Sequence, residues 1–195
     1  MKSKLSAAGA ISAVVLALFT IWITARAKSL EEDFDTRAQA ITKTGQTAPA
    51  LSLPSLDGKT VSLADYHGKP VVLAYWASWC TPCKAEIPIL NRMYQNGRGT
   101  PEEFEILAVS VDEDRAAAET FVRDNAMKYP VLLDPDKKTV DAFHVESVPS
   151  LLVVDRSGQI AYGRSGFDQR TPFELAGKLG IQGFRFGGMD GRRGN

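Results

Sequence analysis

The sequence is poor in cysteine and histidine, with two residues of each in a chain of 195. A small exported domain held together by disulfides would contain more cysteines, spread along its length. Here Cys80 and Cys83 lie together in one C-x-x-C segment. A structural zinc site normally takes four ligands, usually from two such pairs, and only His67 and His144 could add to this one. The cysteines therefore point to a functional site, and no metal site is predicted.

The chain also lacks an excess of charge, because 23 basic and 23 acidic residues give a formal net charge of zero. A nucleic-acid partner would require a basic patch, so we expect no nucleic-acid binding. Without its two ends the chain leaves roughly 135 residues, which is enough for one domain with its own hydrophobic core.

One long apolar stretch is present, and it lies at the N-terminus. Residues 5–24 are apolar or small throughout and follow a start that carries Lys2 and Lys4. About 20 such residues match a helix that crosses a bilayer, with the positive start kept in the cytoplasm. A cleaved signal peptide is the alternative, since Ala25-Arg26-Ala27 fits a cleavage pattern, although the apolar run exceeds the usual signal length. Both interpretations export the domain that follows.

Composition divides the chain into four predicted parts. Residues 1–27 form the transmembrane anchor or signal segment, and residues 28–47 form a polar stem. The domain covers residues 48–182, and residues 183–195 form a tail rich in Gly and Arg that is predicted to be disordered.

Predicted strands and helices alternate within the domain. A hairpin is expected around Asp57-Gly58, a turn signal between apolar segments. Apolar runs rich in β-formers predict strands at residues 71–76, 104–110, 131–133, 151–154 and 159–162. Helices are predicted at residues 82–96, around Phe121 with Asp112 or Asp114 as N-cap, and from Thr171, as N-cap, and Pro172 onward. This order indicates an α/β fold with a central mixed sheet flanked by helices and an N-terminal β-hairpin.

The cysteine pair lies where the first apolar strand should end and a helix begin. The thiolate is the nucleophile in disulfide exchange, and a helix N-terminus favours negative charge, so we expect a lowered pKa for Cys80. Cys83 lies one turn further along and should be more buried, where it can attack the mixed disulfide formed by Cys80. The predicted chemistry is thiol–disulfide exchange through a redox-active Cys80–Cys83 disulfide, without another cofactor.

Four other functions are alternatives for the cysteine pair. A purely structural disulfide would close too short a loop to stabilise the fold much. A peroxidase would carry Pro and Thr or Ser where Leu73 and Ala77 stand. A copper-binding protein could use both cysteines with His144, although no Met-rich copper stretch is present. A disulfide-forming oxidase would need a reduced form that is the more stable one.

Glu86 is the second candidate for chemistry. It follows Cys83 by three residues, and residues at this spacing share one face of a helix. Its carboxylate could therefore accept the proton of Cys83 during resolution of the mixed disulfide. The alternative is a solvated glutamate on the helix surface.

These signals converge on one family. The segment Trp79-Cys80-Thr81-Pro82-Cys83, after an apolar strand and before Glu86 and Pro88, resembles the active site of the TlpA/ResA-like thioredoxins. These are membrane-anchored, thioredoxin-fold reductases that face the periplasm or the outer cell surface, and they include the DsbE/CcmG group of cytochrome c maturation. The resemblance extends over about residues 49–180.

The resemblance implies further site residues. Pro149 should be the cis-proline that faces the cysteine pair, and Val148 should offer backbone hydrogen bonds to an extended substrate strand. Glu86 matches the active-site glutamate of the family, whereas Ala74 stands where thioredoxin itself has a buried aspartate. The expected catalytic residues are Cys80, Cys83, Glu86 and Pro149, and the expected substrate-binding residues are Trp79, Thr81, Pro82 and Val148.

The resemblance also implies partners and location. The expected electron donor is a membrane thiol carrier, and the expected substrates are protein disulfides such as the haem-site cysteines of apocytochrome c or the cysteines of a copper-site protein. The domain is expected in the periplasm, held at the inner membrane by a single-pass anchor or released there if the N-terminus is cleaved.

Overall fold

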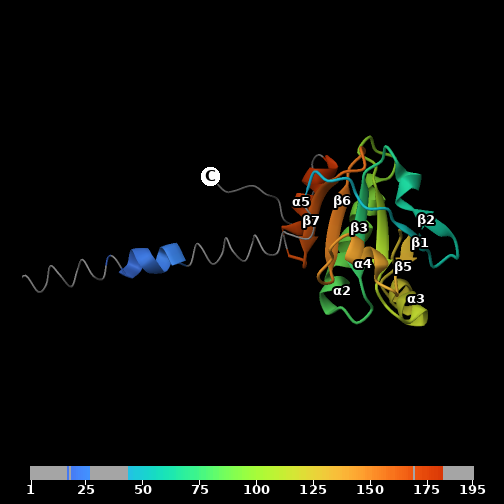
Figure 1. Cartoon of the computed structure of the whole chain (residues 1–195), viewed down its shortest axis with the longest axis horizontal. Helices are drawn as coiled ribbons and strands as arrows, with labels where there is room; N and C mark the ends of the chain where they lie inside the picture. The colour runs from blue at the N-terminus through green and yellow to red at the C-terminus, as the bar shows by residue number, and fades with distance from the viewer. Residues whose placement is uncertain (1–16, 18, 27–43, 169, 182–195) are drawn as a thin grey trace, which may run out of the picture. The chain divides into compact units, whose positions relative to one another are not determined.

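A mixed five-stranded sheet forms the centre of the domain (Figure 1). The computed structural model describes residues 17, 19–26, 44–168 and 170–181. Across the sheet the strands are β5 (Val131–Leu133), β4 (Glu105–Ser110), β3 (Val71–Trp76), β6 (Ser150–Val154) and β7 (Ile160–Ser165). The first three are parallel, and β6 and β7 each run antiparallel to the preceding strand in this order. The predicted mixed sheet is confirmed.

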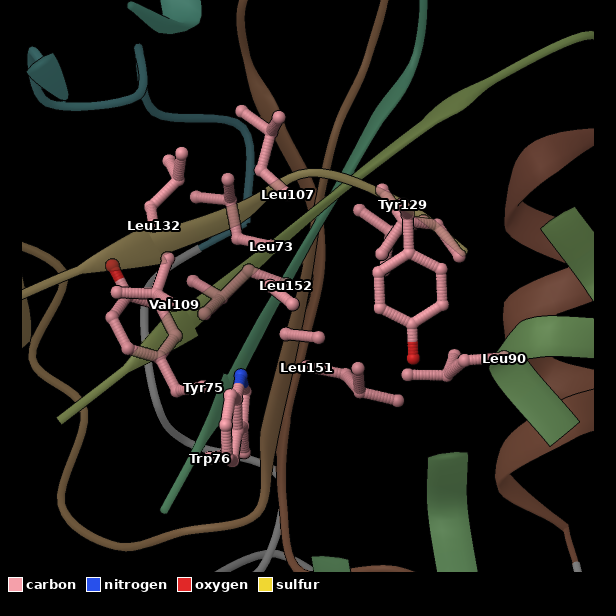
Figure 2. Close-up of a cluster of buried hydrophobic side chains, with 14 of the residues drawn as sticks. Leu73, Tyr75, Trp76, Leu90, Leu107, Val109, Tyr129, Leu132, Leu151 and Leu152 are labelled. Carbon is pink, nitrogen blue, oxygen red and sulfur yellow. The ribbon is translucent and has the colours of Figure 1, made fainter. Parts of the chain in front are cut away.

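Both faces of the sheet are covered, because every residue of β3 and of β4 is buried. Neighbouring residues of a strand point to opposite faces. Trp76 stacks on Phe121 with ring centroids 4.6 Å apart, whereas Tyr75 lies 6.4 Å from Phe143. The continuous apolar runs of the sequence thus correspond to strands that are shielded on two sides, as the core side chains in Figure 2 illustrate.

Five helical segments surround the sheet in the described domain. They are η1 (Leu63–Tyr66), α2 (Thr81–Gly97), α3 (Arg115–Asp124), α4 (Lys138–Ala142) and α5 (Thr171–Leu179). The predicted helices correspond to α2, α3 and α5. The short η1 and α4 were not predicted, because four or five residues are too few to show a helical period.

The predicted N-terminal hairpin is confirmed. Strands β1 (Ser52–Pro54) and β2 (Thr60–Ser62) pair antiparallel in a sheet of their own. Gly58 has a φ of 84° in the turn, a conformation that glycine adopts without a steric cost. Its N–H donates to the carbonyl oxygen of Ser55 at 3.0 Å.

The start of α5 differs from the predicted one. The N-cap is Arg170, which makes no side-chain capping hydrogen bond, and Thr171 is already helical. The Asp168 carboxylate accepts hydrogen bonds from the backbone N–H groups of Arg170 and Thr171 at 2.8 and 3.0 Å. The Asp168 carboxylate, which precedes the N-cap, therefore satisfies the helix N–H groups that the sequence predicts Thr171 to cap.

The predicted anchor falls mostly on residues outside the described ones. Residues 19–26 are helical. In the described parts of the chain, no helix is both long and apolar enough to cross a membrane. The predicted stem and tail fall largely or wholly on undescribed residues, and the four domain limits stay predictions.

Candidate active site

Cys80 and Cys83 form a disulfide at the N-terminus of α2, with Cα atoms 5.4 Å apart. Cys80 is the N-cap residue, and its Sγ accepts a hydrogen bond from the backbone N–H of Cys83 at 3.2 Å. The exposed fraction is 4% for Cys80 and 0% for Cys83. The predicted order of burial is confirmed, and Cys80 lies where unpaired helix N–H groups stabilise negative charge on sulfur.

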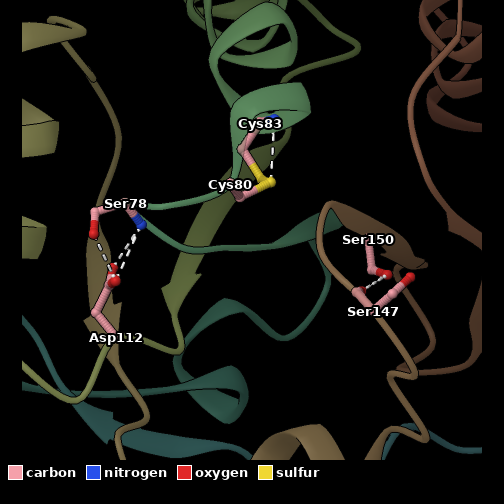
Figure 3. The surroundings of a disulfide bond; sticks show 6 residues. All are labelled: Ser78, Cys80, Cys83, Asp112, Ser147 and Ser150. Atoms are coloured by element: carbon pink, nitrogen blue, oxygen red, sulfur yellow. Dashed lines mark hydrogen bonds between the residues drawn. A yellow bond between two sulfur atoms is a disulfide. The ribbon is translucent and has the colours of Figure 1, made fainter.

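A buried carboxylate holds the segment that leads into Cys80 (Figure 3). Asp112 accepts hydrogen bonds from the backbone N–H and from the Oγ of Ser78, the shortest at 2.9 and 2.8 Å. It also accepts one from the Oγ of Ser110 at 2.9 Å. Asp112 had been one of two candidates to cap α3, but Asp114 makes that bond, to the N–H of Ala116. Asp112 instead ties the turn before the cysteines to the end of β4.

Glu86 lies in the interior, one turn beyond Cys83 on α2, with 1% of its surface exposed. The alternative of a solvated surface glutamate is therefore wrong. Burial raises the pKa of Glu86 to about 8, because a low-dielectric surrounding disfavours the charged form. Its Oε1 has no hydrogen-bond partner. A carboxyl that titrates near neutral pH is suited to exchange a proton with a thiol.

The Val148–Pro149 peptide bond is cis, as the resemblance implied. The next strand, β6, pairs with β3 so that Ser150 lies opposite Tyr75, which brings Pro149 to the end of β3 from which the cysteine segment departs. The Oγ of Ser150 donates to the carbonyl oxygen of Ser147 at 2.5 Å and closes this turn (Figure 3). Two segments far apart in sequence thus meet at one edge of the sheet.

The predicted substrate-binding residues differ in exposure. Trp79 has 70% of its surface exposed, and Thr81 and Pro82 are exposed as well. Val148 is half-buried, next to the buried Pro149. An aromatic ring and two further side chains are therefore accessible around a disulfide that is itself almost covered.

His144 does not complete a metal site with the cysteines. It is exposed, with a φ of 52°. Among the described residues, no three side chains of His, Cys, Asp or Glu form a group that could hold a metal ion. The copper-binding alternative is therefore left without its third ligand.

Sequence analysis did not predict the positions that Asp112 and Tyr129 take near the site. Asp112 was considered only as a helix cap. Tyr129, which precedes β5 and is 5% exposed, was not singled out at all, although its hydroxyl is buried without a hydrogen-bond partner. No local pattern marks either residue, because their contacts come from elements distant in sequence.

Thioredoxin-like thiol–disulfide oxidoreductases are the class that this fold and cysteine pair define. Comparison with known proteins supports this class and identifies the family. The chain belongs to the AhpC/TSA family, whose sequence profile matches residues 44–163. The resemblance inferred from the active-site segment is confirmed by curated relatives and by solved structures.

Among the relatives is the thiol–disulfide oxidoreductase ResA of Geobacillus kaustophilus, 31% identical over 144 residues, which are 74% of this chain and 81% of that protein. ResA of Bacillus subtilis is 34% identical over 116 residues, 60% of this chain and 64% of its own length. Among solved structures, a putative thiol:disulfide interchange protein DsbE from Chlorobium tepidum superposes with a TM-score of 0.66 at 29% identity. That match covers 70% of this chain and 95% of the other. The protein is thus a thiol–disulfide oxidoreductase with a thioredoxin-like fold.

Proposed function

We propose that this protein reduces disulfide bonds of specific protein substrates in the periplasm. The observation that carries the proposal is the placement of the pair: Cys80 caps α2, Cys83 is fully buried behind it, and the buried Glu86 follows one turn later. An ionised carboxylate near the pair would raise the pKa of the cysteines. It would thereby disfavour the reduced, thiolate form, which is the property of a reductant.

The reaction needs the reduced protein as its starting state. The Cys80 thiolate attacks one sulfur of the substrate disulfide, forms a mixed disulfide and expels the other substrate sulfur as a thiolate. Cys83 then loses its proton to the Glu86 carboxylate and attacks Cys80, which releases the second substrate thiolate and re-forms the Cys80–Cys83 disulfide. The substrate gains two electrons, and each expelled thiolate takes up a proton.

The surface around Cys80 suits an extended peptide. The hydrogen bonds among the described residues leave the backbone N–H and C=O of Val148 unpaired, so they are free to pair with a substrate strand. Pro149 holds this turn, and the exposed Trp79, Thr81 and Pro82 provide contacts on the other side of Cys80. These residues would align the substrate disulfide with the Cys80 sulfur.

The proposed substrate, donor and location rest on the family resemblance of the active-site segment. We infer substrates with paired cysteines, such as the haem site of apocytochrome c or the cysteines of a copper-site protein, and a place in cytochrome c maturation. A membrane thiol carrier would re-reduce the pair. Residues 5–24 would anchor the chain in the inner membrane, because their length and apolar character match a bilayer span.

Trapping of substrates tests the proposal. The variant Cys83→Ser should accumulate mixed disulfides through Cys80, because the resolving thiol is gone, whereas Cys80→Ser should be inactive and trap nothing. Non-reducing electrophoresis and mass spectrometry of the cross-linked peptides identify both the cysteine used and the partner. Partners captured through Cys83 instead would overturn the assignment of roles.

The second candidate function is a disulfide-forming oxidase, and the reduction potential separates the two. The favourable helix N-terminus at Cys80 supports a stable thiolate and hence an oxidant. Equilibration of the pair with glutathione or dithiothreitol buffers measures the potential. A value well below the roughly −180 mV of disulfide isomerase supports the reductant, and a value near the roughly −120 mV of a strong oxidant contradicts it.

A further inference from the structure

Among the buried polar atoms that lack hydrogen-bond partners in the described part of the chain are the carboxyl Oε1 of Glu86 on α2 and the hydroxyl of Tyr129. A buried polar atom without a partner costs free energy, and such atoms are uncommon in folded proteins. Glu86 takes part in the proposed reaction, whereas the proposed reaction gives Tyr129 no role. The positions of the two residues relative to α2 explain why both polar groups are buried there.

Tyr129 lies along the face of α2 that carries Glu86. Its ring packs edge-on against Tyr94, with centroids 5.6 Å apart, and in Figure 2 its hydroxyl points toward the side chain of Leu90. Tyr94, Leu90 and Glu86 are spaced by four residues and share a helix face. The direction from Tyr94 to Leu90 leads along α2 toward its N-terminal turn, which carries Glu86 and then Cys83.

In the structure Tyr129 and Glu86 do not hydrogen-bond to each other, but the charge of Glu86 acts on Tyr129. Burial raises the pKa of Tyr129, and the negative charge of Glu86 raises it further. Tyr129 therefore keeps its proton and can act only as a hydrogen-bond donor to a carboxylate. Burial is the cause of the raised pKa of Glu86. Lys84 and Lys128, which are close in sequence to Glu86 and Tyr129, are exposed.

We propose that Tyr129 is a positioning residue for Glu86: its hydroxyl donates a hydrogen bond to the ionised carboxylate and so sets the pH range in which Glu86 accepts the proton of Cys83. The inference rests on the proposed function of the cysteine pair. Burial opposes ionisation of Glu86, whereas a hydrogen bond to the ionised form favours it. Because the last torsion of a glutamate side chain is broad, the carboxylate can turn to the hydroxyl when it ionises.

The step balances without a further reactant. The proton of the Cys83 thiol moves to the Glu86 carboxylate, and the Cys83 thiolate attacks the Cys80 sulfur of the mixed disulfide. A Cys80–Cys83 bond forms, the bond from Cys80 to the substrate breaks, and the substrate sulfur leaves with the electron pair. The Tyr129 proton stays on its oxygen, and only the hydrogen bond is lost as Glu86 becomes neutral.

The test is the pH dependence of resolution in the variant Tyr129→Phe. The reduced full-length protein is mixed with oxidised glutathione, and the rate at which Cys83 releases glutathione from Cys80 is followed across about pH 5 to 10. Burial alone raises the pKa of Glu86 to about 8, so the variant, which lacks the hydrogen bond, should show its inflection near that pH. In the wild type we expect the inflection about one pH unit lower, so the variant should resolve more slowly below its inflection, by up to about tenfold.

Three further variants make the result specific. Glu86→Gln should remove the inflection, and Tyr129→Phe should add no further change to it in the double variant, because the hydroxyl acts through the carboxylate. Tyr75→Phe deletes another buried hydroxyl without a partner, on β3, and should leave the inflection in place. The infrared band of the protonated Glu86 carboxyl can be assigned by its absence in Glu86→Gln. In Tyr129→Phe this band should disappear at a higher pH than in the wild type.

The outcomes distinguish the role of Tyr129 from the proposed function of the cysteine pair. If Glu86→Gln removes the inflection but Tyr129→Phe leaves both the inflection and the infrared titration unmoved, the role of Tyr129 is overturned and the proposed function stands. If Glu86→Gln keeps the inflection, the proposed role of Glu86 fails and the role of Tyr129 fails with it.

Discussion

At the scale of single residues, Glu86 shows how burial converts an ordinary carboxyl into a group that titrates near neutral pH. Its pKa rises from 4.5 to about 8 through burial. The same burial links the protonation of Glu86 to folding, because the unfolded chain has no interior to disfavour the charge. The stability of the domain should therefore depend on pH through this residue.

We predict that Glu86→Gln removes a pH dependence of stability. Between about pH 4.5 and 8 the folded state keeps a proton that the unfolded state has lost, so the free energy of unfolding of the wild type falls as pH rises, by up to about 1.4 kcal/mol per pH unit. The neutral amide has no such slope. Urea unfolding of the oxidised proteins at several pH values measures the difference, and parallel curves for the two proteins would contradict it.

At the scale of elements, α2 combines two tasks. Its N-terminus holds Cys80 as a cap, and its inner face buries Cys83, Glu86, Leu90 and Tyr94. Its last residue, Gly97, lies so close to Phe104 that a Cβ would come 2.7 Å from the Cε1 of the ring. Because Phe104 is almost fully buried, the ring cannot move aside easily. The glycine thus allows the end of α2 to pack against the chain that enters β4.

We predict that Gly97→Ala destabilises the domain by about 1–3 kcal/mol, since overpacking in a dense core shifts the surrounding atoms. Gly177→Ala in α5 is the matched control, because no atom lies within 4 Å of its added Cβ. That change should stabilise the protein by up to about 1 kcal/mol through helix propensity. Thermal unfolding of both variants checks the pair, and an equal shift in the same direction would count against the packing argument.

At the scale of the whole molecule, the proposed anchor in residues 5–24 should decide where the chain is found in the cell. We predict that the full-length chain sediments with membranes and needs detergent for extraction, whereas a chain beginning at residue 44 stays in solution. Fractionation of cells that express each form measures this, and mass spectrometry of the N-terminal peptide tests for cleavage. Soluble periplasmic protein without residues 1–27 would favour the signal-peptide alternative.

Local sequence features predicted much of this molecule. Strands β3 and β5 match their predicted limits because continuous apolar runs mark buried strands, and Cys80 at the start of α2 followed from the strand-to-helix change. The C-x-x-C segment was sufficient for the class of chemistry. The cis bond before Pro149 was anticipated only through the family resemblance, because an X–Pro sequence by itself favours the trans isomer.

The sequence by itself thus determined the reactive pair, the order of the strands and longer helices, and the class of protein, since these depend on residue types and on short-range periodicity. Only the tertiary structure decided which polar groups are buried beside the pair. Sequence spacing did not decide whether Glu86 lies on the surface or in the interior. It also did not predict the contact of Asp112 with Ser78 or the burial of Tyr129. The physical reason is that burial and hydrogen bonding depend on segments that meet in space after long separations in sequence. Asp112 meets the turn before Cys80 in this way, and Tyr129 meets α2.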